Sequence, residues 1–141
     1  MSRQDDAVVE GIAAGTVSGS RRQPVLPIAL LFAFVGAMHF LVPTFFLRIM
    51  PPWVPYPASA VALSGAAEIA GAIGLLVPAA RTAAAWGLIV LLVAVFPANI
   101  HMLMEARATD APALWQASCW LRLPLQPLLM WWVWKAGIQR H

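Results

Sequence analysis

A histidine, a glutamate, an arginine and two amides interrupt the long apolar stretches of this 141-residue chain. They are His39, Glu68, Asn99, Arg122 and Gln126. Glutamate and histidine can transfer protons, arginine can stabilise negative charge, and amides can orient a polar ligand. An ionisable residue costs about 2.5–3.5 kcal/mol at the centre of an apolar membrane span, so its presence there is a functional hypothesis. The candidate catalytic residues are Glu68 and His39.

The composition indicates a membrane protein. Hydrophobic residues make up 61% of the chain and charged residues 11%, against about 45–50% and about 25% in soluble domains. The nine basic residues are scattered singly and form no stripe, so nucleic acid is not an expected partner. The single cysteine, Cys119, excludes an internal disulfide, a dithiol relay or a zinc cluster. These observations argue against a soluble enzyme and an extracellular disulfide module.

Four apolar segments are each long enough to cross a bilayer as a helix. They cover about residues 25–42, 58–77, 82–102 and 114–136. Because every backbone group in lipid needs an internal partner, the predicted fold is all-α, a four-transmembrane-helix bundle over residues 25–141. Residues 1–24 are polar and nearly charge-balanced, which predicts a disordered cytoplasmic tail.

The basic residues predict the orientation. Six of them flank one side of the four spans, namely Arg3, Arg21, Arg22, Arg81, Lys135 and Arg140. The opposite loops carry two, Arg48 and Arg107. By the positive-inside rule, both termini face the cytoplasm and the protein is a multi-pass protein of the cytoplasmic (inner) membrane.

The outer connection between the first two spans is rich in proline. Residues 43–57 read PTFFLRIMPPWVPYP, with five prolines in 15 residues. Residues 45–50 could form a short interfacial helix, and the prolines after it stiffen the return path. Two interpretations remain open for this segment: a rigid anchor at the membrane surface, or a lid over a cavity.

The polar residues converge on one layer between the outer surface and the midplane. Glu68 lies ten residues into its span from the outer end, or about 15 Å. Arg122 lies about eight residues into the fourth span, and we expect the two side chains to interact directly or through one polar group. This layer is either a structural pair with hydrogen-bonding amides or a ligand site. The predicted ligand-binding residues are His39, Ser64, Glu68, Asn99, Arg122 and Gln126, with no metal ligand set.

Helical spacing adds two details. Ala67, Gly71 and Gly74 would let a neighbouring helix approach the second span closely. Pro97 interrupts the hydrogen bonds of the third span, and Pro124 and Pro127 interrupt those of the fourth.

Four segments, in order, resemble the DoxX family of small four-helix integral membrane proteins. They are AMHFLVPTFFLRIMPPWVP (37–55), SGAAEIAGAIGLLVP (64–78), AAWGLIVLLVAVFPANIHM (84–102) and LRLPLQPLLMWWVW (121–134). The resemblance implies association with membrane-bound oxidoreductase complexes. Because no haem, flavin or iron–sulfur ligand set is matched, it implies no covalently bound cofactor, and electron transfer would need a quinone or a redox partner.

Three functions remain open, and the sequence leaves catalytic activity undecided. The first is a membrane subunit that binds a quinone or another apolar small molecule for an oxidoreductase. The second is a channel, transporter or scaffold acting as a homo-oligomer. The third is a stand-alone membrane enzyme that performs acid/base chemistry on a lipid-like substrate, with Glu68 or His39 as acid/base and Arg122 stabilising negative charge.

Overall fold

The computed structural model describes residues 25–139, and every regular element in this range is a helix. The elements are α2 (Val25–Leu41), α3 (Pro43–Arg48), α4 (Pro57–Leu76), α5 (Arg81–Ala108) and α6 (Ala113–Gly137). The all-α prediction is confirmed for this part of the chain. The four long helices coincide with the four apolar segments, except that α5 continues to Ala108. The predicted tail, residues 1–24, lies outside the described range.

Proline is the first residue of two helices, the short α3 and the following α4. Pro43 opens α3 and Pro57 opens α4, which are positions where the missing N–H costs no hydrogen bond and the fixed φ suits a first turn. The short helix therefore begins two residues before the predicted range 45–50 and ends at Arg48. Tyr56 adopts a left-handed backbone conformation (φ 51°) and turns the chain into α4.

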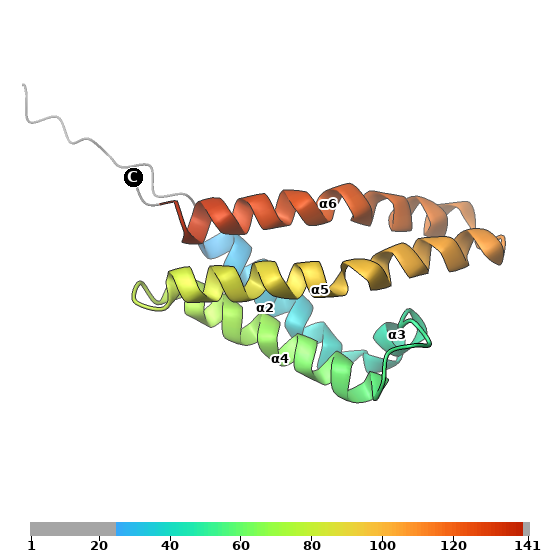
Figure 1. Ribbon diagram of the computed structural model, residues 1–141, viewed down its shortest axis with the longest axis horizontal. Helices are drawn as coiled ribbons and strands as arrows, with labels where there is room; N and C mark the ends of the chain where they lie inside the picture. The colour runs from blue at the N-terminus through green and yellow to red at the C-terminus, as the bar shows by residue number, and fades with distance from the viewer. Residues whose placement is uncertain (1–24, 140–141) are drawn as a thin grey trace, which may run out of the picture.

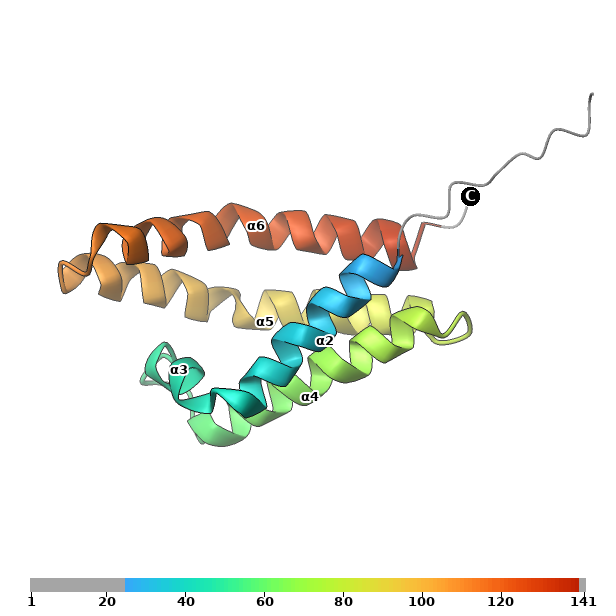
Figure 2. The ribbon, with the colours of Figure 1, turned by 180° about the vertical axis from the view of Figure 1, so that it is seen from behind.

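The helices form two antiparallel pairs that diverge toward one end. α2 packs along α4 and α5 packs along α6, while α4 and α5 connect the pairs and α2 touches α6 only slightly (Figures 1 and 2). The pairs lie close together near the α4–α5 turn and spread apart toward α3. We call these the narrow end and the wide end.

The backbones of α2 and α4 meet at two glycines. A Cβ at Gly36 would lie 2.8 Å from the carbonyl oxygen of Gly65, and a Cβ at Gly65 would lie 2.6 Å from the Cβ of His39. Only glycine permits such an approach. This contact between α2 and α4 was not predicted from the sequence. Of the predicted small residues, Gly71 and Gly74 face α5, whereas Ala67 is exposed.

Two apolar clusters hold the helices together. The larger one occupies the narrow end and draws on all four long helices, with Ile28, Leu75, Leu88 and Val133 almost completely buried. The smaller one joins α5 to α6 at the wide end and contains Cys119, which is fully buried against apolar side chains. Cys119 is thus a packing residue.

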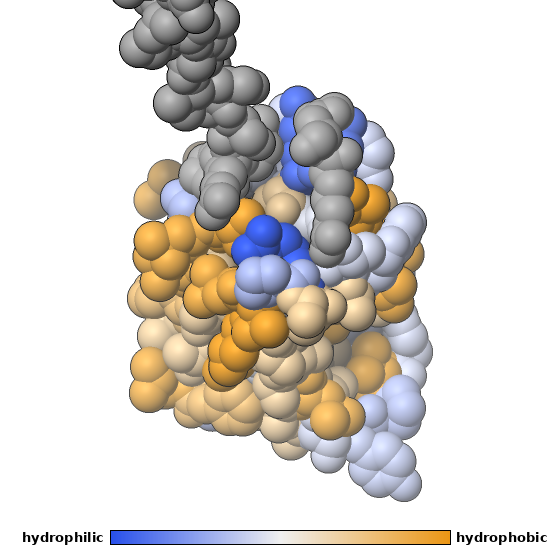
Figure 3. Space-filling view, turned by 90° about the vertical axis from the view of Figure 1, so that its left-hand side faces the viewer, coloured by the Kyte–Doolittle hydropathy of each residue, from blue (hydrophilic) through white to orange (hydrophobic). Residues whose placement is uncertain are grey.

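The outward faces of the long helices are also apolar. Large exposed side chains occur on each of them, such as Phe34 (63% exposed), Leu63 (70%), Val90 (64%) and Leu121 (66%). Viewed from the narrow end, apolar residues cover most of the surface, and the strongly hydrophilic ones appear in the centre and at the top (Figure 3). By length and composition, α4 and α5 could each span a membrane.

The α2–α4 contact gives the first prediction. Gly65→Ala should destabilise the protein by about 1–3 kcal/mol, because the added methyl group must push α2 away from α4. Gly87→Ala is the matched control, since a Cβ there meets nothing within 4 Å. It should be neutral or stabilising by up to about 1 kcal/mol, because alanine has the higher helix propensity. Thermal unfolding in detergent measures both, and equal losses in the two variants would contradict the close contact.

Candidate functional site

A cavity of about 950 Å³ fills the space between the two helix pairs at the wide end. All five described helices contribute to its lining, which is mainly apolar. All six residues predicted from the sequence to bind a ligand line it. They are His39, Ser64, Glu68, Asn99, Arg122 and Gln126.

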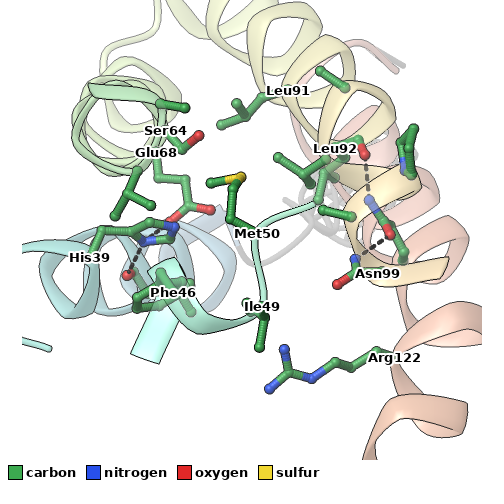
Figure 4. A pocket seen from close by; sticks show the side chains of 18 of the residues that line it. His39, Phe46, Ile49, Met50, Ser64, Glu68, Leu91, Leu92, Asn99 and Arg122 are labelled. Carbon is green, nitrogen blue, oxygen red and sulfur yellow. Dashed lines mark hydrogen bonds and ion pairs between the residues drawn. The ribbon is translucent and has the colours of Figure 1, made fainter. Parts of the chain in front are cut away.

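The first wall of the cavity, formed by α2 and α4, carries His39 beside Glu68. The Nδ1 atom of His39 lies 3.6 Å from Oε2 of Glu68, and both side chains are largely buried. The same Nδ1 is 2.9 Å from the carbonyl oxygen of Val35, one turn back in α2. Phe46 of α3 stacks on the imidazole, with ring centroids 3.8 Å apart (Figure 4). Phe46 therefore fixes one face of the histidine ring, and the Val35 carbonyl fixes its Nδ1 atom.

The Glu68 carboxyl has an unmet hydrogen-bonding requirement. Its Oε2 atom is buried and has no hydrogen-bond partner within the described residues. Buried polar atoms are normally paired, so this oxygen marks a position where a ligand or a water molecule would be stabilised.

The second wall, formed by α5 and α6, carries a hydrogen-bonded pair of amides. Asn99 Nδ2 donates to Gln126 Oε1 at 2.7 Å, and Gln126 Nε2 donates to the carbonyl oxygen of Leu92. Pro97 continues inside α5, but it lacks an N–H and so leaves the carbonyl of residue 93 without its helical partner. Gln126 thus joins the two helices beside the interrupted part of α5. The two amides form an interhelical contact in addition to lining the cavity.

Arg122 lies across the cavity from Glu68, near Ile49 (Figure 4). Its Nη1 atom is 4.0 Å from Sδ of Met102, and its guanidinium carbon is 5.9 Å from the centre of the Phe45 ring. No carboxylate pairs with it among residues 25–139. No side chain in this range bonds to both Arg122 and Glu68 either, so the predicted interaction, direct or through one polar group, is not found. The helical positions place both side chains in the cavity, but the separation of the two helix pairs keeps them on different walls.

The proline-rich segment lines one side of the cavity. Its lining side chains come from α3 and the following turns, namely Phe45, Phe46, Ile49, Met50, Pro51, Trp53 and Val54. Trp53 also contacts His101 of α5 edge to face, with ring centroids 4.9 Å apart. This contact connects the segment to the opposite helix pair.

The side chains that the proline-rich segment contributes to the cavity were not predicted from the sequence. Phe46 stacks on His39, and Met50 projects into the middle of the cavity between the two walls (Figure 4). Helical spacing carries no signal for such contacts, because they cross the break between α2 and α3. Among residues 25–139 there is also no group of three side chains suited to hold a metal ion.

The amide pair gives the second prediction. A double-mutant cycle with Asn99→Leu and Gln126→Leu should show a coupling of about 0.6 kcal/mol in unfolding free energy, and at most about 1.7 kcal/mol, as for interhelical hydrogen bonds in membrane proteins. Gln116 provides the control, because its side chain bonds to Ala111 instead. Asn99→Leu and Gln116→Leu should be additive. Additivity in the first cycle would contradict the interhelical bond.

No curated protein and no solved structure matches the chain. One protein family does match, described as "Domain of unknown function (DUF8561)", over residues 28–137. The match extends from the first turn of α2 to the last residue of α6 and includes every polar residue of the cavity. The chain belongs to the DUF8561 family.

Proposed function

We propose that all four long helices span a membrane, as a four-helix bundle. The support is the ring of exposed apolar side chains on α2, α4, α5 and α6. α2 has 17 residues and would extend about 26 Å, close to the roughly 30 Å hydrocarbon core. α6 has 25 residues, and its polar side chains Arg122 and Gln126 line the cavity rather than facing lipid.

The proposed orientation places the narrow end and both termini in the cytoplasm of the inner membrane. Arg81 begins α5 and Lys135 lies in the last turn of α6, so both belong to the narrow end. The wide end, with α3 and the cavity, then faces outward. The six basic residues flanking the inner side, against two in the outer loops, favour this orientation.

Reporter fusions test the orientation. A reporter that is active only outside the cytoplasm should be inactive when fused after His141 and active when inserted between α5 and α6, next to Asp110. The reverse pattern would contradict the proposed orientation, and activity at both positions would contradict a membrane crossing by α6.

Within this fold, the cavity supports binding of a lipid-soluble small molecule with a polar head, of the quinone class. The observation that carries this proposal is one mainly apolar cavity with polar groups on both walls. Ligand pockets typically combine apolar walls with a few placed polar groups. A quinone-type ring carries oxygen atoms at opposite ends and so matches polar groups on two facing walls, while its tail suits the apolar lining.

The proposal includes a place in a larger assembly. The resemblance to DoxX proteins favours a membrane subunit associated with an oxidoreductase. In that arrangement the partner subunits would exchange electrons with the quinone, and this chain would bind and orient it.

A second candidate rests on the contact between His39 and Glu68. A histidine beside a carboxyl in a mainly apolar cavity is an arrangement that suits proton transfer. An enzyme doing acid/base chemistry on a lipid-like substrate would use the same cavity, with Arg122 stabilising negative charge.

Binding of a short-tailed quinone tests the main proposal. With the protein in lipid nanodiscs, a ubiquinone analogue with a decyl tail should quench the tryptophan fluorescence saturably, because Trp53 and Trp132 line the cavity. Arg122→Met should weaken binding by about tenfold or more, since a hydrogen bond from a charged donor contributes about 1.5–3 kcal/mol. The control Arg107→Met alters an exposed arginine of α5 outside the cavity lining and should bind as the unmodified protein does. Quenching that never saturates, or that is equal in all three proteins, would contradict the proposal.

A further inference from the structure

The protonation of His39 follows from its hydrogen bond. A carbonyl oxygen can only accept, so the 2.9 Å contact between Nδ1 and the Val35 carbonyl requires the proton on Nδ1. In the neutral imidazole, Nε2 then carries a lone pair and accepts. No group in residues 25–139 donates to Nε2, and the ring lines the cavity.

With the Glu68 carboxyl ionised, the first wall therefore presents hydrogen-bond acceptors that lack donors. Besides Nε2 of His39, the buried Oε2 atom of Glu68 has no hydrogen-bond partner. Ser64 lies one turn earlier in α4 and lines the same wall, but its hydroxyl forms no hydrogen bond to either group in the described structure. A ligand atom that donates a hydrogen bond would satisfy this wall, and a ligand atom that only accepts would leave it unsatisfied.

The second wall has the opposite character. Arg122 offers five N–H donors and accepts none, and its one polar contact in the described chain is a sulfur at 4.0 Å. The two amides on this wall, Asn99 and Gln126, already bond to each other. The free hydrogen-bonding capacity of this wall is thus mainly that of a donor.

We propose that the cavity selects the reduced, hydroquinone form of a quinone-class ligand, with one ring hydroxyl donating to the His39–Glu68 wall and the opposite ring oxygen accepting from Arg122. This inference rests on the proposed function and specifies the ligand of the same cavity. A hydroquinone hydroxyl both donates and accepts, so it satisfies both walls. A quinone carbonyl only accepts and would face the unpartnered oxygen of Glu68 as a second acceptor. Sites with buried polar groups reject ligands that leave those groups unpaired.

Three ligands with the same ring and decyl tail test the proposal by equilibrium binding to nanodisc-embedded protein, with empty nanodiscs as the background. They are the hydroquinone, the quinone, and the hydroquinone dimethyl ether, which keeps the ring but has no hydroxyl hydrogen. The hydroquinone should bind about 3- to 10-fold more tightly than either of the others, the effect expected of one satisfied hydrogen bond. Equal or tighter binding of the quinone would overturn the inference while leaving the proposed function in place. Saturable binding of none of the three would overturn the proposed function itself.

Two variants locate the preference in the first wall. His39→Leu should remove most of the preference, whereas Gln116→Leu, which alters a polar residue outside the cavity lining, should retain it. Glu68→Gln replaces an acceptor oxygen with an amide that can donate, so it should shift the preference toward the quinone. Its control is Glu105→Gln, because the Glu105 side chain is 55% exposed and lies outside the cavity lining. If His39→Leu does not fold, the direction of the shift in Glu68→Gln decides the proposal, and an unchanged preference in that variant would overturn it.

Discussion

The close approach of α2 and α4 at Gly36 and Gly65 is the constraint on which the cavity depends. A Cβ at Gly65 would lie 2.6 Å from the Cβ of His39, so the histidine occupies space that a side chain at residue 65 would need. Glu68 lies three residues further along α4, on the adjoining turn. The same contact that brings the two backbones together therefore places the imidazole 3.6 Å from the carboxyl. Structural packing and the chemistry of the first wall share one cause.

The divergence of the two helix pairs follows from where the apolar residues lie. At the narrow end, side chains from all four long helices form one continuous cluster. At the wide end, the buried cluster around Cys119 consists of residues of α5 and α6, and neither α2 nor α4 contributes a buried residue to it. With no common core at this end, the pairs separate and α3 with its proline-rich turns covers the space between them. The prolines suit this position because they stiffen the segment without requiring a sheet or a longer helix.

Polar groups inside the cavity differ in how many of their hydrogen-bonding atoms have partners. Gln126 bonds both to Asn99 and to the Leu92 carbonyl, so the amide pair serves the packing of α5 on α6. Glu68 and Arg122 each lack a full set of partners within residues 25–139. Side chains that packing alone required would be paired with each other, as the amides are. The contrast between the paired amides and the incompletely paired Glu68 and Arg122 is the reason to regard the cavity as a binding site.

The sequence by itself determined the four long helices and the positions of the polar residues along them. Those properties depend on local composition and on the helical repeat, so the apolar segments could be located and six cavity residues selected from spacing alone. The tertiary structure alone decided which residues face each other. Glu68 and Arg122 both line the cavity. Glu68 contacts His39 because glycines bring α2 close to α4, whereas Arg122 lies on the other wall. The stacking of Phe46 on His39 could not be predicted from the sequence either. Helical periodicity specifies the position and the face of a residue within one helix. The residues that it contacts on other helices depend on the distances and angles between helices, which arise only from packing the whole bundle.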